Sequence, residues 1–232
     1  MIGILGGMGT QAGLDFCNKL VILNRGEVDQ NYPLFILYNK SNIPGRPENL
    51  HKYNKVLKSL TKGCLLLQKN KCKFIVIPCN TAHYWYDNLQ KNIKIPIISM
   101  PREVYLCAKK KCKLNSKIGI LATEATLKTR VYNKFFDKNF KLIKPSNHLQ
   151  KKNVNKAIKY VKMGKVKEAE KFIKPAVNYL IKLKCKKIIL GCTELPIAIF
   201  AFKSFKKVKL SKIFLDPNLI LADASMKKYK SL

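Results

Sequence analysis

The sequence is poor in acidic residues and in histidine, and it lacks the usual metal-binding patterns. Of its 232 residues, 13 are Asp or Glu and three are His. His51, His83 and His148 lie too far apart for the H-x-x-x-H spacing of zinc ligands, and no two cysteines form a C-x-x-C pair. These absences exclude the common zinc motifs, so we predict no metal site.

Long apolar runs are also missing. None approaches the roughly 20 residues that a transmembrane helix requires. The chain opens Met1-Ile2-Gly3-Ile4 with no basic segment before the apolar one, which argues against a secretory signal peptide. We therefore expect a cytoplasmic protein without membrane contact, whose eight cysteines are reduced thiols rather than a disulfide framework.

The few acidic residues stand against 46 Lys and Arg, which gives a formal net charge of +33. Such an excess is typical of proteins that bind nucleic acid or anionic membranes. The lysine clusters at 109–111, 151–152, 186–187 and 206–207 are scattered, however, and they do not interleave with aromatic residues as a base-stacking surface does. Nucleic-acid binding is therefore disfavoured, and a positive surface would equally attract a dicarboxylate substrate.

The chain contains an internal repeat. Residues 71–81 (KCKFIVIPCNT) resemble residues 184–194 (KCKKIILGCTE), and the Ile-Gly-Ile-Leu of residues 2–5 recurs at 118–121. Both matches have nearly the same displacement along the chain, so the sequence predicts two similar halves.

Each half alternates short apolar, β-branched runs with longer amphipathic stretches, a pattern typical of buried parallel strands and covering helices. We predict an α/β fold of two pseudo-symmetric domains, each a mostly parallel sheet flanked by helices, with an active-site cleft between them. The domains are residues 1–100, joined by about 210–232, and residues 101–209. Strands are expected at 2–5, 34–38, 74–77, 95–98, 118–121 and 188–190, and helices at 49–68, 103–111, 125–136, 153–163 and 165–183.

The repeat places Cys79 and Cys192 directly after matching strands, at the edge where open parallel sheets bind ligands. Their repeat partners Cys72 and Cys185 precede the same strands, and we expect them to be buried at the opposite end. A loop that opens a helix offers N–H groups that bind carboxylates and lower the pKa of a thiol, and Asn80, Thr81 and Thr193 add donors.

One thiolate and one thiol on opposite sides of an α-carbon could remove a proton from one face and return one to the other. Two other motifs leave alternatives open. His83, four residues after Cys79, is compatible with a Cys–His hydrolase, although a packed histidine is the simpler interpretation. The opening Gly6-Gly7-Met8-Gly9 is only a weak indication of nucleotide binding.

The motifs at residues 78–83 (PCNTAH) and 191–194 (GCTE) resemble those of the aspartate/glutamate racemase superfamily, and the opening GGMG resembles its aspartate or broad-specificity branch. Glutamate racemases usually have His at the position of Glu194, which also favours the aspartate branch. The resemblance covers nearly the whole chain, including Arg46 in IPGR, the GILAT of residues 119–123, and Asp216-Pro217.

The resemblance implies a cofactor-independent amino-acid racemase that needs no pyridoxal phosphate and acts as a homodimer on a small, acidic amino acid, most simply aspartate. Cys79 and Cys192 would be the catalytic acid and base, and Arg46 and Lys162 would bind a side-chain carboxylate. The remaining substrate-binding residues would be Met8, Asn80, Thr81, Thr123, Thr193 and Glu194.

Two alternatives remain for the function. A related isomerase, decarboxylase or hydantoin racemase would use the same fold on another small acid. A nucleic-acid-binding protein on an inactive enzyme scaffold would instead bind strands with a steep salt dependence that survives loss of both cysteines.

Overall fold

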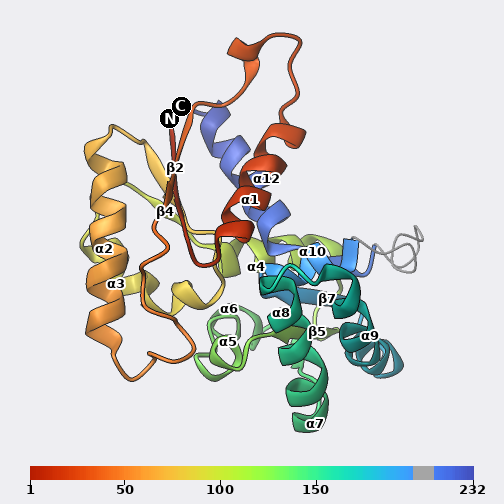
Figure 1. The fold of residues 1–232 in the computed structure, drawn as a ribbon. Helices are drawn as coiled ribbons and strands as arrows, with labels where there is room; N and C mark the ends of the chain where they lie inside the picture. Colours follow the sequence, from red (N-terminus) through yellow and green to blue (C-terminus); the bar gives the residue numbers. More distant parts are fainter. Residues whose placement is uncertain (201–211) are drawn as a thin grey trace. The chain divides into compact units, whose positions relative to one another are not determined.

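The computed structural model describes residues 1–200 and 212–232 (Figure 1). The chain divides into two compact units, the first made of Met1–Glu103 and Asn218–Leu232 and the second of Val104–Pro217. Helix α4 (Met100–Lys111) contains the boundary between them. The lysine pair at 206–207 lies outside the described residues.

The first unit is built on a parallel four-stranded sheet in the order β2-β1-β3-β4. The strands are β1 (Ile2–Gly6), β2 (Phe35–Asn39), β3 (Phe74–Val76) and β4 (Ile97–Ile98). The helices are α1 (Thr10–Leu23), α2 (Tyr53–Lys69), α3 (Tyr86–Lys91) and, apart from its first residue, α12 (Pro217–Lys230), with 3-10 turns at η1 (Asp29–Asn31) and η2 (Thr81–Trp85).

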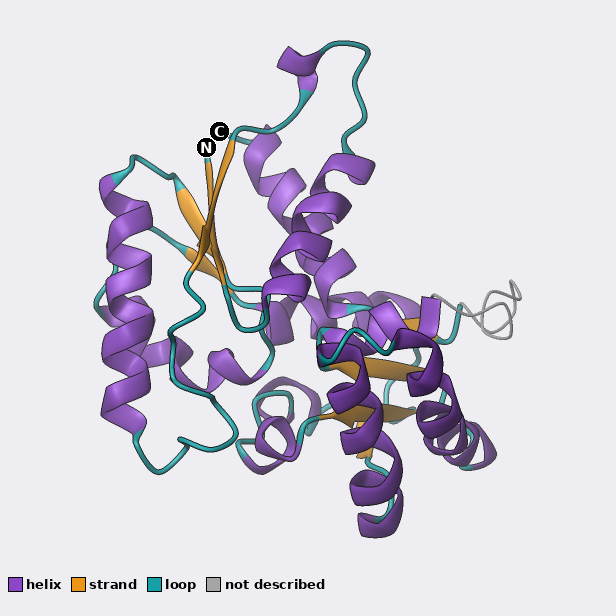
Figure 2. Ribbon diagram, in the orientation of Figure 1, coloured by secondary structure: helices purple, strands orange, loops and turns teal. Residues whose placement is uncertain are grey.

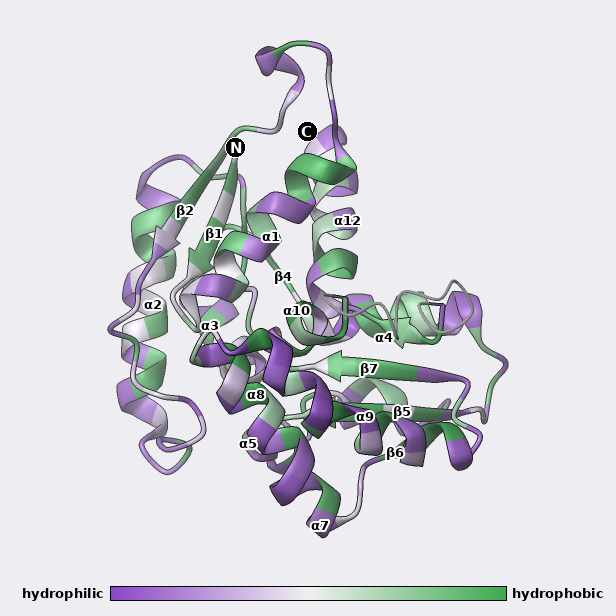
Figure 3. Ribbon diagram, turned by 45° about the vertical axis from the view of Figure 1, so that its right-hand side comes forward, coloured by the Kyte–Doolittle hydropathy of each residue, from purple (hydrophilic) through white to green (hydrophobic). Residues whose placement is uncertain are grey.

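Both faces of this sheet are covered (Figure 2). Helix α2 packs on one face through Val56, Leu60 and Leu67, against strand residues such as Leu5 and Ile75. Helices α1 and α12 pack on the other through Phe16 and Leu221, among others. Because both faces are buried, the central strands are almost entirely apolar, as parallel strands in α/β folds usually are (Figure 3).

The second unit repeats this topology, with a parallel sheet in the order β6-β5-β7-β8. Its strands are β5 (Lys117–Ala122), β6 (Lys141–Ile143), β7 (Lys187–Gly191) and β8 (Phe214–Leu215). Its helices are α5 (Glu124–Lys128), α6 (Asn133–Phe136), α7 (Asn147–Leu149), α8 (Asn155–Lys162), α9 (Val166–Lys182) and α10 (Glu194–Phe200), and a π-helical turn, η3 (Gln150–Val154), joins α7 to α8.

The order of strands is therefore the same in both sheets, with β1, β2, β3 and β4 matched by β5, β6, β7 and β8. This agreement confirms the prediction of two similar α/β halves with parallel sheets. All six predicted strands are present, with boundaries that differ by one or two residues.

Several predictions about helices were incomplete or wrong. The expected helix at 125–136 is two short helices, because Arg130 between them has a left-handed backbone (φ 53°) that an α-helix cannot contain. The segment expected as a helix from 153 begins instead in the π-helical turn. Helices α1, α10 and α12 and the short strands β6 and β8 were not predicted.

Candidate active site

Cys79 follows β3 at the carboxyl end of the first sheet. Its backbone N–H donates to the carbonyl of Ile77 (2.7 Å), so the chain turns tightly as it leaves the strand. Cys79 is 5% exposed, and Asn80 and Thr81, which follow it, are buried with it. The turn continues into η2, so the thiol lies at the start of a short 3-10 turn and not of a long helix.

His83 holds this turn in place through both of its ring nitrogens. Nδ1 lies 2.9 Å from the Cys79 carbonyl oxygen, and the N–H of Met100 donates to Nε2 (3.0 Å). Since Nε2 accepts, the proton is on Nδ1, which donates to Cys79. Burial lowers the pKa of His83 to about 4, so the ring is neutral near pH 7. With both nitrogens occupied, His83 is a packed residue, and the geometry does not support a Cys–His hydrolase.

The glycine-rich turn after β1 is fixed by close backbone packing. Gly7 has φ 87°, and a Cβ at this position would lie 2.3 Å from the carbonyl carbon of Lys40. Met8, the next residue, is buried. Only glycine combines this backbone angle with so close an approach, so the turn requires Gly7 for packing without any bound phosphate.

Arg46 is hydrogen-bonded to the same turn. Its Nη2 donates to the Met8 carbonyl (2.9 Å), and its Nη1 donates to the carbonyls of Pro44 (3.3 Å) and Ile43 (3.5 Å). The side chain is 9% exposed, and its Nε has no hydrogen-bond partner among the described residues. No described carboxylate pairs with this buried cation, which is an environment that favours an anionic ligand.

Cys192 follows β7 at the corresponding place in the second unit. Its thiol donates to Oε2 of Glu194 (2.9 Å), and the Thr193 hydroxyl donates to the same oxygen (3.4 Å). Nζ of Lys162, at the end of α8, lies 3.9 Å from Oε1 of Glu194. Cys192, Thr193 and Glu194 are all buried, whereas the Lys162 side chain is about half exposed (49%).

This environment raises the pKa of the Cys192 thiol well above its usual value. Burial is the main cause, the Glu194 carboxylate adds to it, and Lys162 acts weakly in the opposite direction. The sequence argument expected the loop to lower the pKa of a thiol, and at Cys192 that expectation is wrong because of burial and the adjacent carboxylate. Cys192 is therefore protonated near pH 7 and able to donate a proton.

Thr123 lies beside Cys192 at the same edge of the sheet. Ala122 of β5 pairs with Gly191 of β7. Thr123 follows Ala122 and Cys192 follows Gly191, so the two residues leave adjacent strands at the same level. The Thr123 hydroxyl caps α5 by accepting from the N–H of Thr126 (3.1 Å). The carbonyl of Ala122 accepts from Nε2 of Gln150 (2.9 Å), a residue that the sequence did not single out.

Within each unit the structure brings several of the predicted residues together, and Met8 and Cys79 of the first unit share one buried core cluster. In the first, Met8 contacts Arg46, and Asn80 and Thr81 follow Cys79. In the second, Lys162, Thr193 and Glu194 surround Cys192. Lys162, expected to bind a substrate carboxylate, faces the carboxylate of Glu194. As expected, Cys72 and Cys185 are buried ahead of β3 and β7, at the other end of those strands.

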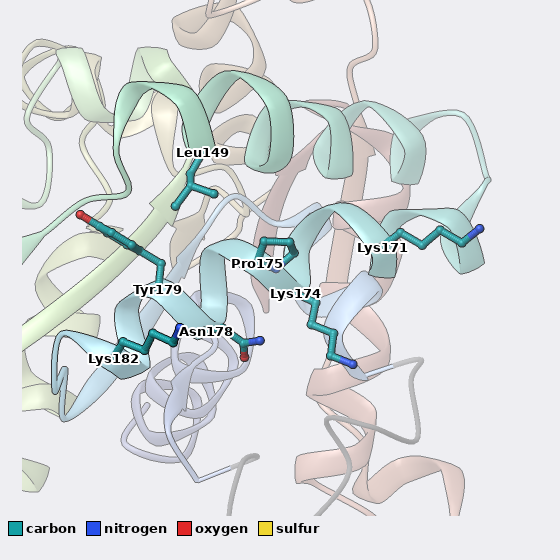
Figure 4. A pocket seen from close by; sticks show the side chains of 7 residues that line it. All are labelled: Leu149, Lys171, Lys174, Pro175, Asn178, Tyr179 and Lys182. Carbon is teal, nitrogen blue, oxygen red and sulfur yellow. The ribbon is translucent and has the colours of Figure 1, made fainter.

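Two hollows occur in the second unit, and neither is bordered by Cys192 or by its neighbours Lys162, Thr193 and Glu194. One, of about 480 Å³, lies along α9, with Leu149 extending toward Pro175 and Tyr179 and with lysines 171, 174 and 182 at its edge (Figure 4). The other, of about 310 Å³, is bordered by Glu124, Gln150 and lysines 128, 144 and 151. Neither contains a cysteine.

Residues 1–200 and 212–232 contain no group of three His, Cys, Asp or Glu side chains placed to hold a metal ion. Over the same residues, no helix combines the length and the apolar character needed to cross a membrane. All eight cysteines are free thiols.

The sequence profile of the Asp/Glu/hydantoin racemase family matches residues 5–224. A broad-specificity amino-acid racemase, RacX of Bacillus subtilis, is 27% identical over 202 residues, which is 84% of this chain and 86% of RacX. Among solved structures, the aspartate racemase of Picrophilus torridus superposes with a TM-score of 0.82 and 28% identity, covering 99% of this chain and 94% of that one.

An aspartate racemase homologue from Pyrococcus horikoshii shares the fold at 22% identity, with a TM-score of 0.79 and coverage of 99% of this chain and 98% of that one. The resemblance predicted from the two cysteine motifs is thereby confirmed, together with the α/β fold and the assignment as an enzyme. The chain belongs to the Asp/Glu/hydantoin racemase family and is an amino-acid racemase of that family.

Proposed function

We propose that this protein interconverts L- and D-aspartate without a cofactor, with Cys79 and Cys192 as the two acid–base groups. The observation that carries the proposal is the hydrogen bond from the Cys192 thiol to Glu194, which gives one protonated thiol at the end of β7. The internal repeat provides a second cysteine, Cys79, at the end of the matching strand β3.

In one direction, the Cys79 thiolate removes the α-proton, and the C–H electron pair stays on the substrate as a carbanion that its carboxylate stabilises. The Cys192 thiol then gives its proton to the opposite face of the same carbon, which inverts the centre. The enzyme is left with Cys79 as a thiol and Cys192 as a thiolate, so the reverse direction starts from this state. The proposal requires both cysteines to reach one substrate molecule.

Thr193, Thr123, Asn80 and Thr81 supply hydrogen-bond donors near the two thiols, and the Met8 turn shapes the substrate's surroundings. Arg46 is proposed to receive the side-chain carboxylate, because it is a buried cation whose Nε has no hydrogen-bond partner within the described part of the chain. The net charge of +33 would speed the capture of a dicarboxylate at low salt. We further propose that the enzyme acts as a homodimer in the cytoplasm.

The experiment that tests this proposal is α-proton exchange of L- and D-aspartate in deuterated water, followed by NMR. Wild type should exchange and invert the α-carbon without added cofactor, and Cys79→Ala and Cys192→Ala should each lose inversion. Cys72→Ala and Cys185→Ala are matched controls, because these cysteines occur in the same repeat at the opposite ends of β3 and β7. They should retain activity.

Full racemisation by either Cys79→Ala or Cys192→Ala would overturn the two-thiol mechanism. Exchange of another amino acid or of a hydantoin, but not of aspartate, would overturn the substrate assignment and leave the mechanism in place. Reaction with a short reagent carrying two thiol-reactive groups, followed by peptide mapping, tests whether Cys79 and Cys192 approach each other. Cross-linking of this pair that is blocked by aspartate is the expected result.

A further inference from the structure

A hydrogen-bonded chain of side-chain amides holds both neighbours of Thr123 in the second unit. Nε2 of Gln150 donates to the Ala122 carbonyl (2.9 Å) and to Oδ1 of Asn155 (2.8 Å). Nδ2 of Asn155 in turn donates to Oε1 of Glu124 (2.8 Å). Thr123 is therefore held on its amino side by Gln150 and on its carboxyl side by Asn155.

The π-helical turn η3 is what brings these two amides together. In an α-helix, residues five apart are separated by about 140° around the axis and do not meet. In η3 the backbone N–H of Asn155 instead donates to the carbonyl of Gln150, an i to i+5 bond. That bond stacks the two residues, so their side chains reach each other and the β5–α5 loop.

The bond to Ala122 has a direct consequence for Thr123. The peptide group between them is planar, with its C=O and N–H pointing in opposite directions. Because the Ala122 C=O points to Gln150, the Thr123 N–H is directed away from it. The Thr123 hydroxyl is fixed separately, as the cap of α5. Gln150 is 5% exposed, so its bonds are protected from competition with water.

The π-helical turn continues into α8, and this helix reaches the loop that contains Cys192. Helix α8 begins at Asn155, which bonds Glu124, and ends at Lys162, which lies 3.9 Å from Glu194. Glu194 accepts the hydrogen bond of the Cys192 thiol. The turn and the helix therefore form one continuous helical element that contacts the loop of Thr123 at one end and the loop of Cys192 at the other.

We propose that Gln150 and Asn155 are positioning residues for substrate binding at Thr123, and that the π-helical turn is the feature of the fold that places them. This inference rests on the proposed function, in which Thr123 is a substrate donor. It assigns a role to two residues that do not themselves reach the reacting atoms.

Three single variants, one double variant and one control test the proposal. Gln150→Ala removes both donors, Gln150→Glu keeps the size but replaces the donors with acceptors, and Asn155→Ala removes the bond to Glu124. Asn153→Ala is the matched control, because Asn153 lies in the same turn and its Nδ2 donates to the carbonyl of Phe172 (2.9 Å), in α9 and not in the loop. Circular dichroism establishes that each variant is folded.

The first readout is backbone hydrogen exchange, which needs no substrate. Exchange of residues 122–126 should accelerate in Gln150→Ala and Asn155→Ala and stay unchanged in Asn153→Ala, while exchange of β7 stays unchanged in all of them. Equal acceleration by Asn153→Ala would show a general loosening of the turn and would overturn the proposal.

The second readout is steady-state kinetics on the amino acid that wild type racemises. KM should rise about tenfold in Gln150→Ala, and at least as much in Gln150→Glu, with kcat within about twofold, because positioned donors bind substrate and transition state alike. The double variant Gln150→Ala/Asn155→Ala should be less than additive, since the two act as one network.

The two proposals fail separately. If wild type racemises no amino acid, the proposed function fails, while the exchange experiment still decides whether the amides hold the loop. If wild type is active but the Gln150 and Asn155 variants match Asn153→Ala in both KM and exchange, the positioning role is overturned and the proposed function stands.

Discussion

The Cys192 thiol donates a hydrogen bond to the Glu194 carboxylate over 2.9 Å, in surroundings that exclude water from both groups. A carboxylate beside a thiol opposes ionisation, because it would place two negative charges side by side and break the hydrogen bond. Glu194 thus adds to the effect of burial in keeping Cys192 protonated, and Lys162 on the other carboxylate oxygen acts in the opposite direction.

Glu194→Gln should therefore lower the pKa of the Cys192 thiol. Cys192 then loses its proton at a lower pH than in the wild type. For the reaction direction that uses Cys192 as the acid, the alkaline limb of the kcat/KM profile should therefore move to lower pH. Because burial, the main cause of the raised pKa, is unchanged in this variant, Cys192 should stay protonated near pH 7, and the effect on activity should be confined to the alkaline limb.

Lys162→Met is the control variant, in which the pKa of the Cys192 thiol should shift in the opposite direction. It removes a cation that lowers the pKa of the thiol, so the same limb should move to higher pH. If both variants shift the limb in the same direction, Cys192 is not the group that the profile reports.

Arg46→Met should discriminate between substrates. If Arg46 binds the side-chain carboxylate, kcat/KM for aspartate should fall about tenfold or more, because a hydrogen bond to a charged group contributes about 1.5–3 kcal/mol. A slowly used neutral amino acid such as alanine should be affected much less. Equal losses for both substrates would instead indicate that Arg46 acts by holding the Met8 carbonyl and the glycine-rich turn.

Some of these site residues could be predicted from the sequence, and others could not. The repeat predicted the two sheets, because strands buried on both faces are continuous apolar runs that periodicity detects. It also placed Cys79 and Cys192, since residues that follow parallel strands lie at one edge of a sheet. Glu194 was predicted only as a substrate-binding residue, and its contact with the Cys192 thiol became visible only in the folded chain.

Gln150 and Asn155 could not be predicted, because residues five apart do not share a face of an α-helix and the π-helical turn leaves no pattern in apolar spacing. Helix α1 was missed for a related reason. It begins directly after the glycine-rich turn without a side-chain cap, and it includes Gly13, a residue that usually weakens helices. The buried face formed by Ala12, Phe16 and Leu20 compensates through packing.

His83 should make the stability of the protein depend on pH. Its pKa is about 4 in the folded state, against an ordinary value of 6.5, because burial disfavours the charged ring. The unfolded chain therefore binds more protons than the folded one between these values. The stability that the neutral His83 ring contributes to the folded state is fully present above about pH 6.5. It is lost as pH falls toward 4, by on the order of 3 kcal/mol.

Urea unfolding between pH 4 and pH 8 measures this effect. Replacing His83 with Gln should flatten the acid side of the curve, at the expense of lower stability at pH 7, where bonds to the Cys79 carbonyl and the Met100 N–H are disturbed. A variant that keeps the full slope of the wild type between pH 4 and 6.5 would assign that slope to other groups.

Gly7→Ala should destabilise the first unit more than backbone preference alone explains. Gly7 combines φ 87° with a position where a Cβ would lie 2.3 Å from the carbonyl carbon of Lys40. Gly164 provides the comparison, because its φ is 76° and a Cβ there would have no described atom within 4 Å. Both substitutions force alanine into the left-handed region, at a cost of about 1–2 kcal/mol, but only the first also requires the backbone at Lys40 to move.

Thermal and urea unfolding of the two variants separate these contributions. Gly164→Ala should lose about 1–2 kcal/mol, and Gly7→Ala should lose clearly more and should also lose activity, because Met8 and its bond from Arg46 follow directly in the chain. Similar losses of stability in the two variants would mean that the turn can relax away from Lys40, and the packing argument for Gly7 would then be wrong.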